Sequence, residues 1–196
     1  MDYYSFSALL LVALVMVVIA ALALGIYALA RRKQRGEQLR AAFGPEYDYA
    51  LERFGDERRA ERELAHRMKR VRKFHIQPLS ARDHERFSVA WSQTQARFVD
   101  DPNGAIGEAD RLVKEVMGVR GYPMADFDQR VADLSVDHAN VVQHYRAARA
   151  LAQSTEEGRA TTEDLRQAMI HYRALFADLL ETQSMEQPGW VQEVRA

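Results

Sequence analysis

The feature that most constrains this chain is an uncharged run of 25 residues near its N-terminus, FSALLLVALVMVVIAALALGIYALA, from Phe6 to Ala30. As an α-helix with a rise of 1.5 Å per residue, the run would be about 37 Å long. That length exceeds the ~30 Å hydrocarbon core of a bilayer. The sequence therefore predicts a transmembrane helix over residues 6–30, preceded by a short N-terminal tail at residues 1–5.

A cleaved secretory signal is the alternative interpretation of this run, because Ala28-Leu29-Ala30 fits the A-x-A pattern of a cleavage site. A signal peptide normally begins with basic residues, whereas the segment Met-Asp-Tyr-Tyr before the run contains no Lys or Arg. The run is also longer than the roughly 7 to 15 apolar residues of a signal core. Both mismatches favour an uncleaved anchor.

Five basic residues follow the run closely: Arg31, Arg32, Lys33, Arg35 and Arg40. Lys and Arg beside a membrane span are retained on the cytoplasmic side, and they attract anionic headgroups. The cluster therefore predicts a single-pass protein of the bacterial inner membrane, with anionic lipid as a partner. Its N-terminus is expected outside and its C-terminal domain in the cytoplasm.

The segment after the run, residues 31–75, carries 14 Lys and Arg against 8 Asp and Glu, whereas residues 76–196 carry 13 against 19. The first helix is expected to continue to about Phe43, where Gly44-Pro45 provides a stop and then a first-turn proline. A second helix is expected from there to about Phe74. Its apolar residues form two short patches separated by a polar gap, so this helix is predicted to be a charged, solvated stalk.

Clustered basic residues in this stalk raise the alternative of a nucleic-acid partner, since binding to phosphates requires them. Between residues 56 and 73, however, eight bases alternate with four acids, and neither an aromatic stacking pattern nor a recognition helix is visible. The sequence therefore predicts no nucleic-acid partner.

Residues 76–182 are predicted to form five amphipathic helices, because apolar residues recur at helical spacing and no segment alternates with period two. Capping and breaking residues mark the expected helices: 81–99 after Ser80, 102–120 after Asp101, 125–134, a helix capped by Asp137, and a helix that begins with a capping box of Thr161 and Asp164. The expected fold class is all-α: a transmembrane helix, a charged juxtamembrane helix and a compact bundle of about five helices, followed by a flexible tail at residues 183–196.

Candidate metal or acid–base chemistry rests on six histidines, because the chain has no cysteine to supply a thiolate. The phrase HYRA occurs twice, and it places His144 and His171 at the borders of apolar stripes on the fourth and fifth bundle helices. Two packed helices could bring these rings together as a haem or metal site. The alternative is a pair of border histidines beside buried tyrosines. No metal-ligand, Gly-rich or nucleophile motif is present, so the sequence predicts neither catalytic activity nor a cofactor.

The stretches at residues 43–71, 97–148 and 160–180 resemble an uncharacterised bacterial family of single-pass, membrane-anchored helical proteins that are often labelled secreted. The resemblance implies that anchor and helical domain form one unit, and it implies no activity. A secreted label would place the domain outside, contrary to the charge argument. We expect a membrane-anchored scaffold or adaptor whose acidic bundle recruits a protein partner, and self-association is compatible with it. The rival hypothesis is a haem- or metal-binding protein that uses His144 and His171.

Overall fold

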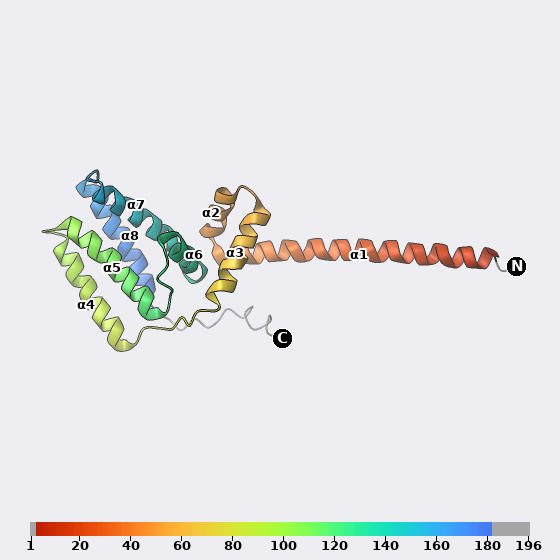
Figure 1. The fold of residues 1–196 in the computed structure, drawn as a ribbon, viewed down its shortest axis with the longest axis horizontal. Coiled ribbons are helices and arrows are strands. Elements are labelled where there is room, and N and C mark those ends of the chain that lie inside the picture. The colour runs from red at the N-terminus through yellow and green to blue at the C-terminus, as the bar shows by residue number, and fades with distance from the viewer. Residues whose placement is uncertain (1–2, 182–196) are drawn as a thin grey trace. The chain divides into compact units, whose positions relative to one another are not determined.

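The structure is a computed structural model that describes the backbone of residues 3–181, and their side chains except those of residues 3–13, 15 and 156. This described part contains eight α-helices and no strand, so the predicted all-α class is confirmed (Figure 1). The chain divides into two compact units, Met1–Ala42 and Phe43–Ala196. The predicted tail at residues 183–196 lies outside the described residues.

The first unit consists of helix α1 (Tyr3–Phe43) up to Ala42, and the helix ends at the residue that the sequence predicted. Its described side chains from Leu14 to Ala30 are all exposed. When only described residues are considered, no helix is long and apolar enough to cross a membrane. Residues 6–13 and 15 of the predicted span lie outside that set.

The second unit begins with two short helices where the sequence predicted one. Gly44 precedes α2 (Pro45–Phe54), and Gly55 ends it in the left-handed region, at φ 65°. Asp56 then caps α3 (Glu57–Val71) by accepting a hydrogen bond from the Arg59 amide at 2.9 Å. The prediction of a continuous helix is wrong because a left-handed glycine followed by an aspartate both stops one helix and starts the next.

The prediction of a solvated stalk is also wrong for α2 and α3. These helices pack against each other, and α3 packs against α6. As a result Tyr47 and Ala50 of α2, and Leu64 and Val71 of α3, are buried. The break at Gly55 folds one apolar patch of the sequence back towards the other, so that two patches too short to cover a helix alone cover each other.

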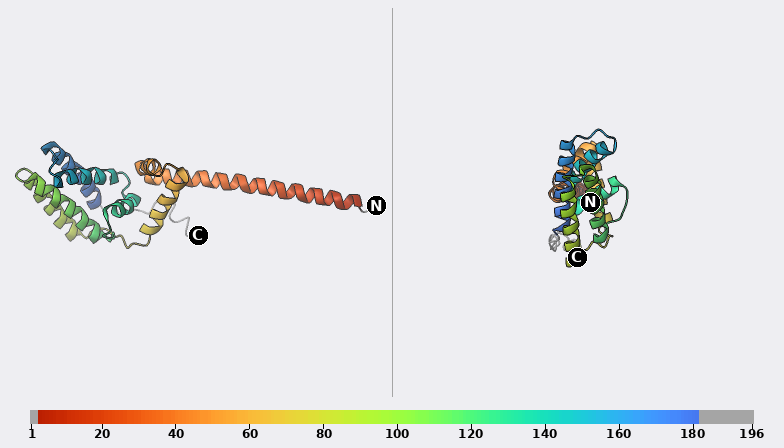
Figure 2. Two further views of the ribbon diagram at one scale, coloured as in Figure 1. Left: turned by 45° about the horizontal axis from the view of Figure 1, so that its top comes forward. Right: turned by 90° about the vertical axis from the view of Figure 1, so that its left-hand side faces the viewer.

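The five remaining helices follow in the predicted order and share one hydrophobic core. They are α4 (Ala81–Arg97), α5 (Pro102–Arg120), α6 (Phe127–Asp137), α7 (Val142–Glu156) and α8 (Thr162–Leu180). Helix α8 packs against both α5 and α7. Helix α4 packs against α5, and the two lie side by side in every view of Figures 1 and 2. Trp91 of α4 stacks on Phe176 of α8, with ring centroids 4.5 Å apart.

Local capping signals account for most of these helix starts. Ser80 and Asp101 accept hydrogen bonds from the amides of Asp83 and Gly104, at 3.0 and 2.9 Å, as the sequence predicted. The capping box that begins α8 is also present.

The predicted cap at Asp137 is wrong, because α6 continues through this residue. The Asp137 carboxylate instead accepts a hydrogen bond from the Tyr122 hydroxyl at 2.9 Å. Helix α7 consequently begins after Val141 without a side-chain cap.

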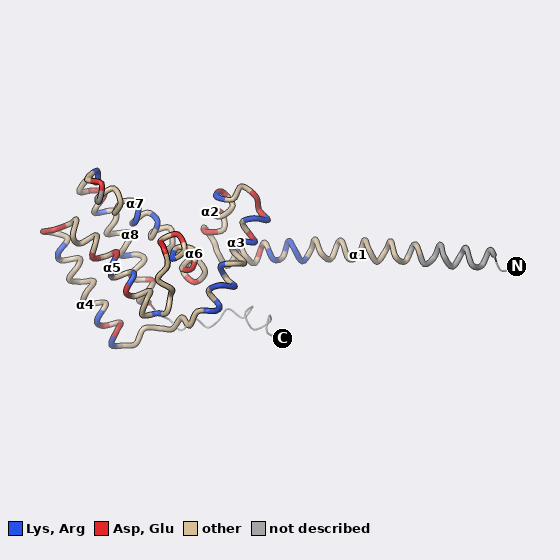
Figure 3. Tube along the Cα trace, viewed as in Figure 1, with Lys and Arg blue, Asp and Glu red and all other residues tan. Residues whose placement is uncertain are grey.

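Charge is unevenly distributed along the helices. Lys and Arg gather in the last part of α1 and along α3, whereas the two signs are mixed on α4, α5 and α8 (Figure 3). Helix α3 therefore differs in charge from the bundle helices of its own unit.

Candidate functional site

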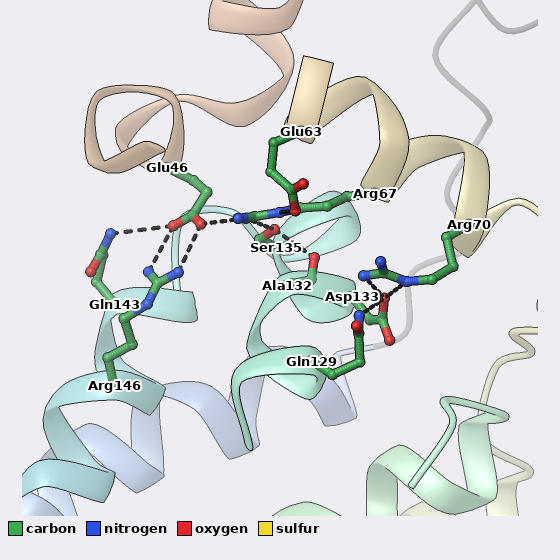
Figure 4. Close-up of polar contacts among 10 residues, drawn as sticks. All are labelled: Glu46, Glu63, Arg67, Arg70, Gln129, Ala132, Asp133, Ser135, Gln143 and Arg146. Carbon is green, nitrogen blue, oxygen red and sulfur yellow. Dashed lines mark hydrogen bonds and ion pairs between the residues drawn. The ribbon is translucent and has the colours of Figure 1, made fainter. Parts of the chain in front are cut away.

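The most extensive polar cluster of the second unit surrounds Glu46, whose side chain is fully buried in the first turn of α2. Arg146 of α7 donates two hydrogen bonds to this carboxylate, one to each oxygen, both at 2.7 Å. Arg67 of α3 donates a third to Oε1 at 2.8 Å, and Gln143 of α7 a fourth to Oε2 at 3.4 Å. Figure 4 shows these side chains converging from three helices, and we call them the Glu46 cluster.

The two arginines of the Glu46 cluster are themselves held by further contacts. Arg67 donates through Nε to Glu63 at 3.1 Å, which is the i,i+4 pair expected along α3. It also donates to Ser135 of α6 at 3.3 Å. The guanidinium of Arg146 lies over the Tyr49 ring, 3.8 Å from its centroid. The cluster therefore joins α2, α3, α6 and α7.

The arrangement leaves Glu46 without chemical reactivity. An ionised carboxylate offers about four lone-pair positions, and four N–H groups of Arg67, Gln143 and Arg146 occupy them. Neither oxygen is open to a substrate or a metal ion. What the cluster can do is fix the α2–α3 hairpin in one position on α6 and α7, because the buried Arg67 and the largely buried Arg146 both pair with this carboxylate.

A second contact between α3 and α6 lies beside the Glu46 cluster. Arg70 donates through Nε to Asp133 at 2.7 Å, and Gln129 donates to the same oxygen at 3.2 Å. Asp133 is 1% exposed, so it is nearly as deeply buried as Glu46. The α2–α3 hairpin is thus attached by two buried carboxylates as well as by apolar contacts (Figure 4).

His138, at the end of α6, is the most deeply buried ring among the predicted candidates for chemistry. Its Nε2 lies 3.2 Å from Nη1 of the buried Arg120, and its Nδ1 is hydrogen-bonded to Asp178 of α8. Since arginine only donates, Nε2 accepts, and we assign the proton to Nδ1. Both ring nitrogens are occupied, so His138 has no lone pair for a ligand.

The structure brings His144 of α7 and His171 of α8 together. Their Nδ1 atoms are 2.9 Å apart and their ring centroids 5.1 Å apart, which fits one imidazole donating a hydrogen bond to the other. The described residues contain no group of three or more His, Asp or Glu that could hold a metal ion. The pair therefore offers at most two protein ligands.

The tyrosines of the two HYRA phrases are buried, and each has its own partner. The Tyr172 hydroxyl donates to Asp110 of α5 at 3.1 Å, and the Tyr145 hydroxyl accepts from Nε of Arg130 at 3.3 Å. Burial is the main cause that raises the pKa of both hydroxyls. They remain neutral and act as structural polar groups within the core.

The pKa of His171 is lowered from its ordinary value, first by burial and then by the charge of His144. The unfolded chain therefore binds this proton at a higher pH than the folded one. As the pH falls from about 6.5 towards the lowered pKa of folded His171, the free energy of unfolding is expected to decrease, and it recovers as the pH rises again. His171→Gln should make the pH dependence of urea unfolding shallower in this window. The exposed His84, replaced in the same way, is the control, and equal slopes for wild type and His171→Gln would contradict the assignment.

The basic residues predicted to face lipid lie on α1, within the first unit. Arg31, Lys33, Arg35 and Arg40 are exposed and Arg32 is half-buried. The guanidinium of Arg31 lies 5.4 Å from the centroid of the Tyr27 ring. No local sequence pattern indicates the Glu46 cluster, because its three charged members are 21 and 79 residues apart.

Comparisons with known proteins add nothing to this geometry: no protein-family model, no curated protein and no solved structure matches the chain.

Proposed function

We propose that this chain is a membrane-anchored helical interaction protein that acts by binding and not by catalysis. In this proposal residues 6–30 form a single span in a bacterial inner membrane, and the second unit lies on the cytoplasmic side. The observation that carries it is the surface of α1: from Leu14 to Ala30, every described side chain is both uncharged and exposed.

A helix that exposes apolar side chains on all sides is stable only when another apolar environment removes those side chains from water. Each Leu, Ile or Val moved out of water stabilises the covered state by about 1.5–3 kcal/mol. A helix with a single apolar stripe can be covered by one neighbouring helix, whereas a helix apolar all round needs a membrane or a protein core. The adjacent basic residues Arg31 to Arg35 favour the bilayer, because they would lie at the level of anionic headgroups.

Binding in place of catalysis is supported by the state of the buried charges. The oxygens of Glu46 and both ring nitrogens of His138 are occupied by other side chains. Groups that are fully hydrogen-bonded to one another stabilise one arrangement of helices, but they have no unused donor or acceptor for a substrate. The helical unit is then a rigid body that presents surfaces.

The anchor is tested by placing charge in the middle of the run. Ile19→Arg combined with Leu22→Arg is expected to release most of the chain from membranes in an alkaline carbonate wash. The reason is that each arginine at the centre of a span costs roughly 2.5–3.5 kcal/mol. Gln34→Arg with Gln38→Arg adds the same charge outside the run and should leave the chain in the membrane fraction. Retention of the first variant at the level of wild type would refute the anchor.

Orientation is tested separately, because the chain contains no cysteine that would react in the background. Gln93→Cys adds one thiol on the exposed side of α4. We expect a membrane-impermeant maleimide to label it only after the cells are permeabilised. Labelling in intact cells would show the opposite topology while leaving the anchor itself in place.

A further inference from the structure

Helix α3 carries charges that alternate along the sequence but separate in space. Between residues 56 and 73 four acids are interspersed among eight bases. Residues four and seven apart lie on the same side of a helix, whereas immediate neighbours do not. Whether this segment presents mixed or uniform charge therefore depends on which side each residue occupies.

The four acids are turned towards partners of their own unit. Asp56 caps α3, and Glu63 accepts from Arg67 beside the Glu46 cluster. The other two, Glu57 and Glu61, both lie within hydrogen-bond reach of the Tyr47 hydroxyl of α2, at 3.3 and 3.5 Å, and its single proton is donated to one of them at a time. Two of the acids therefore serve the contact between α2 and α3, and the other two form bonds within the α3 segment itself.

Five of the bases form a separate surface, which we call the α3 basic face: Arg58, Arg59, Arg62 and Lys69 on α3, and Lys73 just after its end. All five are exposed. Arg58, Arg62 and Lys69 follow each other at intervals of four and seven residues, opposite the buried side that contains Leu64 and Val71. Along the helix axis Arg58 and Lys69 are about 17 Å apart.

The bases of the α3 basic face have no ion pair, unlike several other exposed arginines of the unit. Arg86, Arg97, Arg111 and Arg166 are each paired with an Asp or Glu three or four residues away. Within the described residues, no carboxylate lies within 4.0 Å of the side-chain nitrogens of the α3 basic face. Five neighbouring cations without counter-charges create a positive potential that attracts a polyanion.

We propose that the α3 basic face binds the headgroups of an anionic phospholipid membrane. The proposal rests on the proposed anchor, since a chain held in the bilayer keeps this face close to lipid at high effective concentration. The geometry favours lipid over nucleic acid for two reasons. Helix α3 contains no Phe, Tyr or Trp on which a base could stack, and a single row of cations on a convex helix fits a flat charged surface.

The test uses the full chain reconstituted in vesicles of phosphatidylcholine, with or without about a third of phosphatidylglycerol. Ala65→Cys provides one labelling site beside the α3 basic face, on an exposed residue. A fluorophore attached there is read against a quencher carried on lipid headgroups. We expect quenching in the anionic vesicles and little in the neutral ones, and we expect it to weaken as salt screens the charges. The same label at Gln93→Cys on α4 should respond less.

Matched charge variants connect the signal to the α3 basic face. Arg62→Gln with Lys69→Gln removes two of its charges, and each basic residue near an anionic surface contributes roughly fivefold to the attraction. The ratio of docked to undocked label should therefore fall roughly 10- to 30-fold. The control, Arg82→Gln with Arg173→Gln, removes two exposed charges from α4 and α8 and should change the ratio less than twofold, roughly.

Three outcomes would overturn the proposal: equal quenching in the two kinds of vesicle, equal effects of the two double variants, or a label that responds to added duplex RNA or DNA and not to phosphatidylglycerol. The last outcome would identify nucleic acid as the partner. Flotation of the same samples keeps this test distinct from that of the anchor. A chain that floats with neutral vesicles but shows no anionic response retains the anchor and loses only the lipid contact.

Discussion

Glu46→Gln is expected to lower the free energy of unfolding of the second unit by about 3–5 kcal/mol, the cost typical of removing one partner from a buried ion pair. The substitution keeps the size of the side chain but removes the charge that Arg67 and Arg146 share. One amide oxygen cannot replace two carboxylate oxygens, and the N–H groups of the amide would face the N–H groups of the arginines, so that two sets of donors would meet without an acceptor. Two guanidinium groups, 5% and 17% exposed, would then lack a full counter-charge.

Urea unfolding of the full chain in mild detergent, followed by circular dichroism, measures this loss. Glu63→Gln is the control, because Glu63 pairs with the same Arg67 but is 33% exposed, so its loss should cost under about 1 kcal/mol. Hydrogen exchange gives a second readout: amides of α2 and α3 should lose protection in Glu46→Gln before those of α8. A loss below about 1 kcal/mol for Glu46→Gln would contradict the role assigned to the Glu46 cluster.

The parts of the fold that the sequence predicted correctly are those governed by local signals. Ser80, Asp101 and Thr161 each cap the helix that they were expected to cap. Each capping side chain bonds an amide within three residues, so the sequence pattern that predicts the cap contains both partners of the hydrogen bond. The left-handed Gly55 followed by Asp56 is a signal of the same kind, and it would have divided the expected stalk into two helices.

The Glu46 cluster could not be predicted in this way. Glu46 lies in the first turn of α2, where the usual role of an acid is to complement the helix dipole. Its bonds to Arg67 and Arg146 span 21 and 100 residues, and only the packing of α2, α3 and α7 brings the three together. His144 and His171 are a different case, since the repeated HYRA phrase placed them on neighbouring helices and their Nδ1 atoms lie 2.9 Å apart.

The charge of α3 shows why counts along a sequence are insufficient for a surface. The acids interspersed among the bases were an argument against a nucleic-acid partner. Because Glu57, Glu61 and Glu63 contact Tyr47 and Arg67, they lie to either side of the row formed by Arg58, Arg62 and Lys69. Contacts within the second unit thus separate acids from bases on the surface of α3.

Gly121→Ala is the second substitution expected to have a large effect, a loss of about 2–4 kcal/mol in the free energy of unfolding. Gly121 ends α5 with φ at 96°, a backbone conformation that alanine adopts only under strain. A methyl group there would also overlap the carbonyl oxygen of His75 and lie 3.2 Å from its carbonyl carbon. The connection between α3 and α4 passes at this point, where the Gln77 amide donates to the Arg120 carbonyl at 2.9 Å.

Gly107→Ala, in the same helix, is expected to act in the opposite direction. Gly107 is helical and exposed, and a methyl group added to it meets nothing within 4 Å. Alanine in a helix interior is favoured over glycine by roughly 0.5–1 kcal/mol, so this variant should gain that amount. Thermal and urea unfolding measure the stability of both variants. Because each variant adds one methyl group, a difference between them reports the position of that group and not its presence. A Gly121→Ala protein as stable as wild type would mean that the α3–α4 connection does not lie against the end of α5.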